Sequence, residues 1–258
     1  MPLAAALESV WTHLTPPEAG REAVHRVLPD PALSLAFGCR REMDGRPVDP
    51  RMLLIGPKRR PFLFAPAPGF ELVAVRMKLE WVGPLLGLAP AELADTQPDL
   101  AVFFPRLAES ALQRLSDTRT PARAIAVLTD VVRRWAEPRH LPGIEGAALD
   151  LVRHAGGRLE ISRVAARLSA SPRHLRRLVK RRAGVSLKQY GRTMRFLTAV
   201  TEADRAPAPQ WARIAADAGF CDQSHLVRES HALCGMSPAA VDWERRAEAE
   251  TSNRRRAG

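Results

Sequence analysis

The chain has 258 residues, of which 46% are hydrophobic, and its formal net charge at pH 7 is +11. A chain of this length and apolar content can bury the cores of two domains, and it contains no run of about 18 apolar residues that would span a membrane. Its three cysteines have no CxxC spacing, which excludes a disulfide framework or a cysteine-rich zinc site. The N-terminus has no basic and apolar leader, so we expect a cytoplasmic protein.

The first half of the chain alternates short apolar runs with turns rich in proline, glycine and aspartate. Strands are expected at residues 24–28, 33–38, 52–55, 62–65 and 71–77. This pattern predicts a small antiparallel sheet or barrel. Short helices are expected to follow at 80–88 and 90–94.

The period of the apolar residues becomes helical from residue 103. One helix is expected to carry an apolar face made of Phe104, Leu107, Ala111, Leu112 and Leu115. A second begins at Thr120 and Pro121, an N-cap followed by a first-turn proline. We expect these helices, at 103–136, to form an association surface. Residues 137–143 contain two prolines and a glycine, which predicts a linker.

The positive charge is concentrated behind this linker. Residues 1–143 have a net charge of +2, and residues 144–258 have a net charge of +9. Such asymmetry indicates a polyanionic partner, either nucleic acid or an anionic membrane. A merely solvated basic surface has the same composition, so charge alone leaves these interpretations open.

The basic segment is predicted to be entirely helical, and it contains an internal repeat. Residues 161–168 (ISRVAARL) align with residues 211–218 (WARIAADA), and after a turn that is one residue longer, Gly184 aligns with Gly235 and Ser186 with Ser237. Each unit is predicted to form a helix, a tight turn and a second helix. A long helix at 187–203, with Ser186 as its cap, is expected to join the two units.

The second helix of the first unit, at 173–182, separates into two faces. Ser171 and Pro172 are expected to begin it. Leu175, Leu178 and Val179 face a core, whereas the outward face consists of Arg173, Arg176, Arg177 and Lys180, four cations without an acid. Like charges at this spacing destabilise an isolated helix, and an anion along the helix removes the penalty. A helix-turn-helix unit places its second helix in the DNA major groove, where arginine pairs with guanine or contacts phosphate.

The second unit is less basic. Gly219 suits a positive φ angle in its turn, and Asp222 or a neighbour is expected to cap the following helix. The residues expected to face outward are Gln223, Ser224, Val227 and Arg228. Glutamine can read adenine, valine can touch a thymine methyl group, and arginine can bind phosphate or guanine. Glu229 on the same helix makes its role in DNA binding less certain than that of the first unit.

These residues resemble the AraC/XylS family of bacterial regulators over about 147–241. The resemblance rests on Ile161–Leu168, Ser171–Leu178, Gly184–Tyr190, Arg195-Phe196, Ile214–Phe220, Asp222–Arg228 and Gly235–Pro238. It implies two helix-turn-helix subdomains that bind DNA, with Arg173, Arg176 and Arg177 at base-reading positions of the first. In the second, Gln223, Ser224 and Val227 fall at base-reading positions, and Arg228 falls at a backbone-contacting one.

Two core positions depart from the pattern of the family. Ser230 and Val241 stand where the family has aromatic residues, although Trp243 is close to the second position. The second subdomain is therefore expected to pack more weakly or differently. The N-terminal half resembles, less specifically, the cupin-like sensor domain of some members, through Pro29-Asp30, Ile55–Arg60 and Leu85–Pro90 followed by Glu92-Leu93.

Other functions find less support in the sequence. Residues 1–135 contain only His13 and His25, and the chain has no GxSxG, P-loop, HExxH or GxGxxG motif, so we expect no enzyme, no cofactor and no metal site. His174 and His225 are expected at the edge of the core or on the backbone, with a phosphate contact as the alternative. A membrane-surface helix ranks low because the repeat offers its apolar stripe a protein partner.

The sequence thus predicts an α+β chain: a small sheet or barrel with helices, followed by an all-helical part with two helix-turn-helix units. Residues 1–136 are expected to sense an effector or to dimerise, 137–143 to link, 144–250 to bind DNA, and 251–258 to form a basic tail. The expected function is transcription regulation by sequence-specific binding of promoter DNA, under a small-molecule effector, with a homodimer and a contact to RNA polymerase as further expectations. An architectural or repair-associated DNA-binding protein is the alternative.

Overall fold

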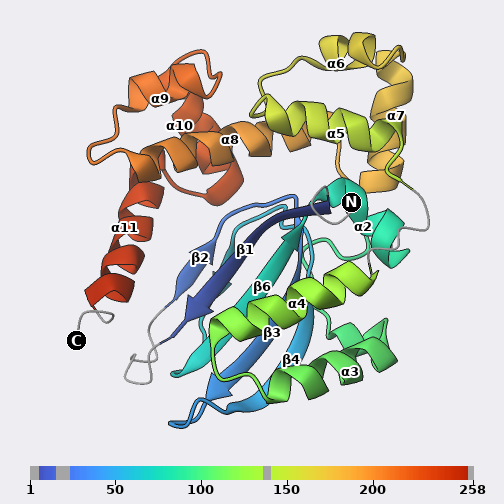
Figure 1. Ribbon diagram of the computed structural model, residues 1–258. Coiled ribbons are helices and arrows are strands. Elements are labelled where there is room, and N and C mark those ends of the chain that lie inside the picture. Colours follow the sequence, from blue (N-terminus) through green and yellow to red (C-terminus); the bar gives the residue numbers. More distant parts are fainter. Residues whose placement is uncertain (1–5, 16–23, 136–140, 255–258) are drawn as a thin grey trace.

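The computed structural model describes residues 6–15, 24–135 and 141–254 (Figure 1). A region of sheets and helices, up to residue 135, precedes a region of helices that begins at residue 144. The expected linker falls between them: residues 137–140 lie outside the described residues, and residues 141–143 are in neither a helix nor a strand.

Antiparallel strands form two sheets in the described part of the first region. The larger sheet has the order β1-β6-β3-β4, and β2 pairs only with β5. The strands are β1 (Leu7–Leu14), β2 (His25–Val27), β3 (Leu33–Arg41), β4 (Pro47–Ile55), β5 (Phe62–Phe64) and β6 (Phe70–Met77). The described strands do not close into a barrel, so the barrel alternative of the sequence analysis is wrong and the sheet is confirmed.

Strand β3 lies in the interior of the larger sheet. Its Ala36 is paired with Leu53 of β4 on one side and with Ala74 of β6 on the other. Seven consecutive residues of β3, from Leu33, are buried, because both faces of the sheet are covered. Along this buried stretch the larger residues Leu33, Leu35, Phe37 and Cys39 alternate with the small residues Ser34, Ala36 and Gly38, so the two faces differ in side-chain size.

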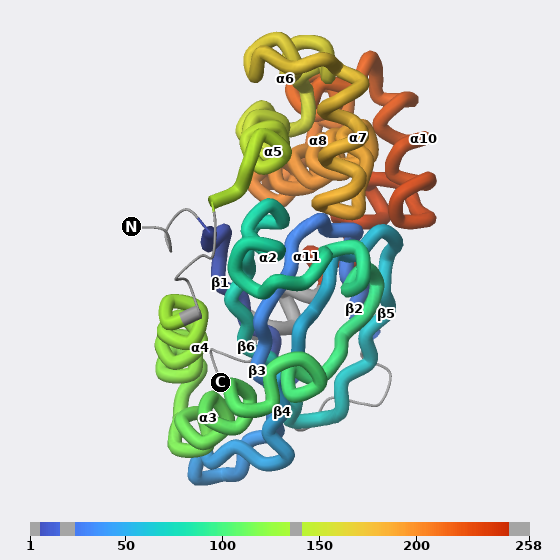
Figure 2. Tube along the Cα trace, turned by 90° about the vertical axis from the view of Figure 1, so that its right-hand side faces the viewer, coloured from blue at the N-terminus to red at the C-terminus, as the bar shows by residue number. Residues whose placement is uncertain are grey.

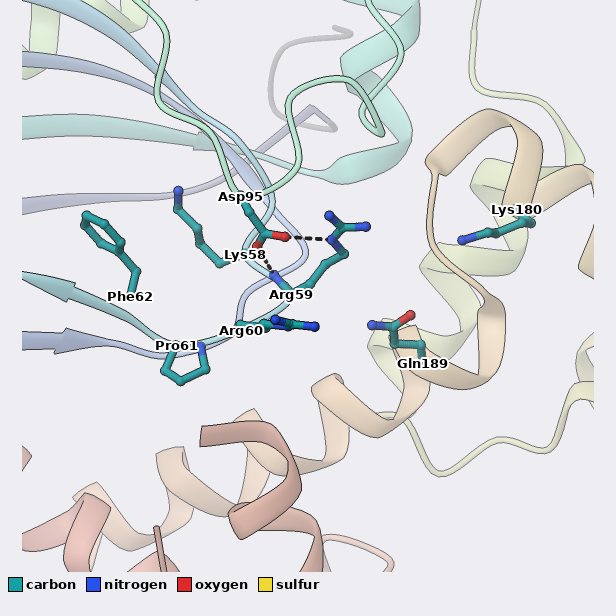
Figure 3. A pocket seen from close by; sticks show the side chains of 8 residues that line it. All are labelled: Lys58, Arg59, Arg60, Pro61, Phe62, Asp95, Lys180 and Gln189. Carbon is teal, nitrogen blue, oxygen red and sulfur yellow. Dashed lines mark hydrogen bonds and ion pairs between the residues drawn. The ribbon is translucent and has the colours of Figure 1, made fainter. Parts of the chain in front are cut away.

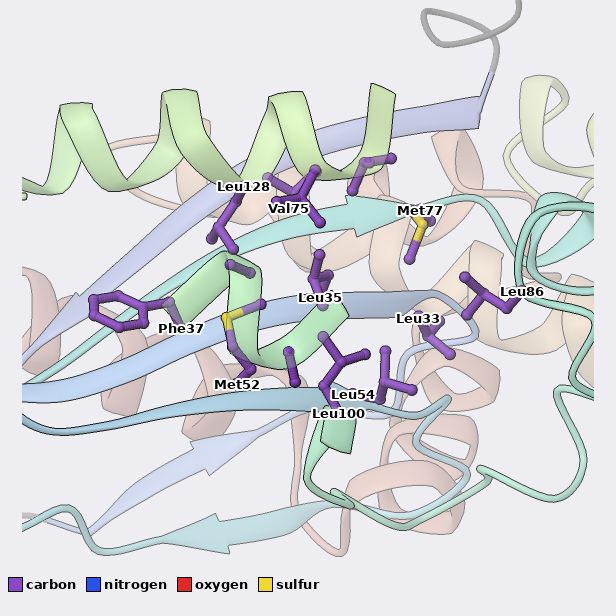
Figure 4. Packing of buried hydrophobic residues seen from close by; sticks show 14 of the residues in the cluster. Leu33, Leu35, Phe37, Met52, Leu54, Val75, Met77, Leu86, Leu100 and Leu128 are labelled. Atoms are coloured by element: carbon purple, nitrogen blue, oxygen red, sulfur yellow. The ribbon is translucent and has the colours of Figure 1, made fainter. Parts of the chain in front are cut away.

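Helices cover one face of this sheet. In Figure 2, α3 (Pro105–Ser116) and α4 (Pro121–Trp135) lie on one side of the larger sheet, whereas β2 and β5 lie on the other. Alternate residues of β3, such as Leu35 and Phe37, pack with Met52 of β4 and with Leu128 of α4 (Figure 4). The apolar face of α4 and the side chains on one face of β3 and β4 therefore form one apolar core.

Two features of this region differ from the sequence analysis. No strand was expected at Leu7–Leu14, but β1 pairs with β6 at the edge of the sheet. Half of its residues are polar and most of its side chains are exposed, so its sequence lacks the apolar pattern of a strand. The segment is a strand because its backbone pairs with β6. The expected helix at 90–94 is wrong: this segment forms turns after α2 (Leu79–Leu86), and Asp95 then reverses the chain with a φ of 60°.

The second region consists of helices, as expected. They are α5 (Ile144–His154), α6 (Ile161–Arg167), α7 (Pro172–Ala183), α8 (Leu187–Arg205), α9 (Trp211–Asp217), α10 (Gln223–Cys234) and α11 (Pro238–Arg254). Residues 251–254 of the expected tail continue α11, and residues 255–258 lie outside the described residues. No helix in the described part of the chain has the length and hydropathy needed to cross a membrane.

Two of the contacts between the first region and the second involve buried apolar residues and ion pairs. Leu79 of α2 is 3% exposed and packs in the core that α5, α7 and α8 form around Leu175 and Tyr190. Beside it, the Arg153 guanidinium donates to both oxygens of Glu80, at 2.5 and 3.1 Å. At the other point, Leu28 packs against a cluster that includes Phe196, and Arg26 Nε lies 3.0 Å from an oxygen of Glu244 on α11.

Candidate DNA interface

The first helix-turn-helix unit is α6 and α7. Val164 and Ala165 of α6 are buried together with Leu175 and Val179 of α7 in one cluster. The Ser171 hydroxyl oxygen accepts the His174 N–H at 3.2 Å, so the expected N-cap is confirmed. These contacts orient α7 with its basic face away from the core.

The basic face of α7 is exposed as the sequence predicts. Arg173, Arg176, Arg177 and Lys180 are all exposed. In the described part of the chain, none of the four has a carboxylate partner, although eighteen ion pairs occur elsewhere. Lys180 Nζ donates to the carbonyl oxygen of Gly184 at 3.1 Å, at the C-terminal end of α7. The mutual repulsion of these cations stays uncompensated until an anion approaches.

The second unit, α9 and α10, repeats this arrangement. The Asp222 carboxylate accepts the His225 N–H at 2.6 Å and begins α10, so the expected cap is confirmed. Gln223, Ser224 and Arg228 are exposed, and Val227 is half-buried. All four lie in the N-terminal half of α10.

Glu229 does not oppose an anion at this surface. One of its oxygens lies 2.6 Å from Arg192 Nε of α8, and its side chain is 18% exposed. The ion pair therefore turns the acid toward the connecting helix and neutralises it. Whether the second unit binds DNA as the first is expected to do stays a prediction.

The turns of the two units require the same backbone conformation. Gly219 has a φ of 84°, and Ser169 at the equivalent position has a φ of 49°. Glycine adopts this left-handed region without a steric penalty, whereas serine does not. The first unit therefore contains a strained residue where the second contains none.

Helix α8 and its neighbours hold the two units together. Its 19 residues correspond to a length of about 28 Å. Arg158, which follows α5, donates to the carbonyl oxygen of Asp217 at 3.1 Å, and the Arg195 guanidinium of α8 lies 5.6 Å from the centre of the Phe220 ring. These contacts join the segment between α5 and α6, and the connecting helix α8, to the turn of the second unit.

The two repeated histidines lie in different surroundings. His174 is exposed on α7. The His225 ring is half-buried and packs edge-on against Phe220 with a centroid distance of 5.4 Å, and its Nδ1 lies 3.4 Å from the N–H of Cys221. The expectation of a core-edge histidine describes His225 but not His174.

The departures from the family pattern are accommodated in the core. Ser230 is fully buried and its hydroxyl donates to the carbonyl oxygen of Met236 at 2.7 Å. Val241 is 2% exposed and packs in the core itself, whereas Trp243 is 72% exposed. Trp243 therefore does not take the place of the missing aromatic residue.

Sequence reasoning did not assign a functional role to Lys58, Arg59 and Arg60. They form the loop between β4 and β5, and the structure places them opposite Lys180 of α7 and Gln189 of α8, around a cavity (Figure 3). Three consecutive cations after Gly56-Pro57 were a visible signal of a charged turn. Their proximity to Lys180 depends on how the two regions pack.

The comparisons with known proteins cover both regions. Residues 164–242 match a family described as a helix-turn-helix domain, and residues 1–99 match one described as a domain of unknown function (DUF6597). The first match begins within α6 and covers the rest of the first unit and all of the second. A search of curated proteins finds no match.

Solved structures of ToxT from Vibrio cholerae are similar to the chain. The structure from strain O395 bound to (E)-4-(8-methylnaphthalen-1-yl)but-3-enoic acid has a TM-score of 0.50 and 10% identity, covering 92% of this chain and 99% of that chain. Fatty-acid-bound ToxT from strain SCE256 has a TM-score of 0.46 and 9% identity, covering 92% and 96%. A 1.65 Å structure of ToxT has a TM-score of 0.49 and 9% identity, covering 92% and 99%. The first of these supports the α+β fold, in which a sheet region precedes a helical region.

Proposed function

We propose that this chain, whose C-terminal region contains an AraC-type helix-turn-helix DNA-binding domain of transcription regulators, binds specific duplex sequences under the control of a small-molecule effector. The observation that carries the proposal is the exposed, acid-free stripe of Arg173, Arg176, Arg177 and Lys180 on the second helix of a repeated unit. A DNA duplex supplies the dense line of negative charge that such a stripe requires.

The proposed roles follow the position of each side chain. Arg173, Arg176 and Arg177, nearer the N-terminus of α7, read base edges in the major groove. Lys180, one turn before the end of α7, contacts phosphate. In α10, Gln223, Ser224 and Val227 read bases and Arg228 contacts phosphate. With α8 as a connector, one chain reaches two successive major-groove faces, about 34 Å apart, and reads an asymmetric site.

We assign effector sensing to residues 1–136 and DNA binding to residues 144–250. Supporting this division, the core under α3 and α4 consists of residues of the first region, whereas Leu79 and Leu28 are the described residues of that region that enter the helical cores. A ToxT structure with a similar fold is bound to an aromatic carboxylic acid, and we extend to this chain the expectation of a small-molecule effector. Dimerisation through the outer faces of α3 and α4 is compatible with this assignment, and no catalysis takes part in it.

Specific DNA binding can be tested by selecting duplexes from a random library with the full-length protein. Fluorescence anisotropy then compares the selected duplex with a scrambled one across a salt series. Arg177→Ala should weaken binding to the selected duplex by about 1–3 kcal/mol, as the loss of a bidentate base contact does, and affect the scrambled duplex less. Arg106→Ala, which removes an exposed arginine of α3, serves as the matched control and should change neither affinity.

Two results would contradict the proposal. Equal losses on both duplexes would make Arg177 a phosphate contact instead of a base-reading residue. Failure to enrich any sequence, with binding that disappears as salt rises, would indicate non-specific binding and favour an architectural protein.

A further inference from the structure

A turn at residues 155–158, between α5 and α6, lies against the connecting helix α8, which runs from the first unit to the second (Figure 1). Two glycines allow this close approach. A Cβ added at Gly157 would fall 2.1 Å from the carbonyl oxygen of Gly191, and one added at Gly156 would fall 3.1 Å from the Thr198 hydroxyl oxygen. Because Gly191 and Thr198 are about two helical turns apart, the backbone of the turn follows the surface of α8. The turn is therefore fixed on the connector.

Arg158 extends from this turn to the second unit. Its Nη1–H donates to the carbonyl oxygen of Asp217 at 3.1 Å, and its Nε–H donates to the carbonyl oxygen of Ala155 at 3.1 Å. Asp217 is the last residue of α9, where a helix leaves carbonyl oxygens without an intrahelical donor and carries the negative end of its dipole. The stem of Arg158 packs on Gly219, where a Cβ would fall 2.6 Å from the arginine Cγ. One guanidinium thus links the end of α5 to the end of α9.

The connector contacts the second unit at two further places. The Arg195 guanidinium lies 5.6 Å from the centre of the Phe220 ring, which is 4% exposed, in a cation–π contact. Arg192 Nε lies 2.6 Å from an oxygen of Glu229. Phe220 precedes the cap of α10 by two residues, and Glu229 lies within α10. These contacts orient α10 with respect to α8.

The contact made by Arg158 is not a requirement of the helix-turn-helix unit itself. The internal repeat places residue 161 opposite residue 211, so Gly156-Gly157-Arg158 corresponds to Ala206-Pro207-Ala208 before α9. The second unit forms the same two helices without a cation or a glycine at these positions. Because α9 and α10 form without an equivalent side chain, Arg158 serves the arrangement of the two units and not the folding of either one.

We propose that Arg158 is a positioning residue that fixes α10 with respect to α7, and that it thereby restricts the protein to one separation of the two DNA segments that the units read. This inference rests on the proposed function, because it needs both units on one duplex. Each base pair inserted between the segments moves the second by about 3.4 Å along the duplex and rotates it by about 35°. A hydrogen bond of 3.1 Å does not survive a displacement of that size. The contact therefore makes a wrong separation costly.

Binding to duplexes of altered separation tests this specificity. Hydroxyl-radical footprinting first locates the two protected segments of the duplex selected above, and one base pair is then inserted between them. The insertion should weaken binding of the wild type by about tenfold or more, because contacts of one unit are lost. Arg158→Ala should bind the parent duplex about threefold more weakly, because less of the arrangement is fixed before binding, and the insertion should then cost it only about threefold. Arg158→Lys keeps a donor and a positive charge at the end of α9 and should restore most of the discrimination.

Arg213→Ala is the matched control. Arg213 is an exposed arginine of α9, and its Nε lies 3.6 Å from an oxygen of the Asp217 carboxylate, within the second unit. Its loss should leave the ratio of affinities for the parent and inserted duplexes unchanged, because a phosphate contact contributes equally to both. A ratio in Arg158→Ala equal to that of the wild type would overturn the positioning role. A wild type that binds both duplexes equally would also overturn it, since the second unit would then set no separation.

The position of α10 can be measured without DNA, by electron-spin distance measurements on the full-length protein. Nitroxide labels are attached at His174→Cys on α7 and at Ala232→Cys on α10, both at exposed positions. Cys221→Ser removes the exposed native thiol, whereas Cys39 and Cys234 are buried and do not take up the label. The measured distance then reports how α7 and α10 lie with respect to each other.

In this labelled background the distance between α7 and α10 should have one narrow distribution. Arg158→Ala should broaden it, and Arg213→Ala should not. A distribution that Arg158→Ala leaves unchanged would mean that α8 and the first region, through Leu79 and Leu28, fix the two units alone, and it would overturn the proposal. If no duplex is selected, the proposed function fails, whereas the spin-label result still decides whether Arg158 fixes the units.

Discussion

Glu80→Gln is expected to weaken the contact between the first region and the first helix-turn-helix unit. Glu80 and Arg153 form a bidentate ion pair, and their side chains are 3% and 11% exposed. The substitution keeps the shape of the side chain but leaves the Arg153 charge nearly buried. The remaining partners of Arg153 are the Asp150 carboxylate, which is 43% exposed, and the Tyr190 hydroxyl at 3.4 Å.

The size of the effect follows from the burial of this pair. Removing one partner of a fully buried ion pair costs about 3–5 kcal/mol. Because Asp150 still contacts the guanidinium and glutamine retains an acceptor, we expect a loss of about 2–3 kcal/mol in the free energy of unfolding. For a chain of this size that loss lowers the melting temperature by about 5–10 °C. Arg153 is also favoured in its charged form, since Glu80 raises its pKa despite burial.

Urea unfolding followed by circular dichroism measures this loss. The double variant Glu80→Met with Arg153→Met should recover to within about 1 kcal/mol of the wild type, because no buried charge is left unpaired. Glu244→Gln breaks the second ion pair between the regions, to Arg26, whose side chains are 24% and 32% exposed, and should cost less than about 1 kcal/mol. If Glu80→Gln were as stable as the wild type, or the double variant less stable than the single one, the docking of α2 on α5 would be wrong.

Three further substitutions test the fold, each by urea unfolding. Gly157→Ala should lower stability by about 3 kcal/mol or more, because the backbone has a φ of 75° and the new Cβ would lie 2.1 Å from the carbonyl oxygen of Gly191; a loss under about 1 kcal/mol would refute this approach. Ser169→Gly should raise stability by about 0.5–1 kcal/mol by relieving its left-handed conformation, and a decrease would contradict the strain. Burial, assisted by His25, lowers the pKa of His13 from 6.5 to about 4. The unfolded chain is therefore protonated first, and the wild type should lose about 1–2 kcal/mol, after allowance for solvent screening, as the pH falls from 6.5 to about 4. His13→Asn should show a shallower dependence over that range, and an equal slope would exclude His13 as its source.

Local signals in the sequence predicted the helix-turn-helix units well. The caps at Ser171, Ser186 and Asp222 are confirmed because each accepts an N–H only three residues further along the chain. The two faces of α7 follow from its helical period, and Leu175 and Val179 are buried as expected. The family match at residues 164–242 agrees with the repeat. The DNA roles of the exposed side chains remain predictions.

The first region was harder to predict because its segments depend on distant partners. Strand β1 exists through its pairing with β6, more than fifty residues away, and its own residues favour no conformation strongly. The segment at 90–94 has helix-forming residues, but the N–H of Asp95 bonds to Pro57 and the chain turns there. In both cases tertiary hydrogen bonds override local propensity.

The sequence by itself determined the elements whose signals lie within a few residues: the capped helices, the repeat, the acid-free stripe of α7 and the positive charge of the second half. Only the tertiary structure decided that Glu229 is neutralised by Arg192, that Leu79 completes a core of the helical region, and that Lys58 and Arg60 face Lys180. Helix periodicity and capping are encoded over three to four residues. The surroundings of a charge depend instead on which distant segments pack against it, and for Lys58 and Lys180 those segments come from opposite halves of the chain.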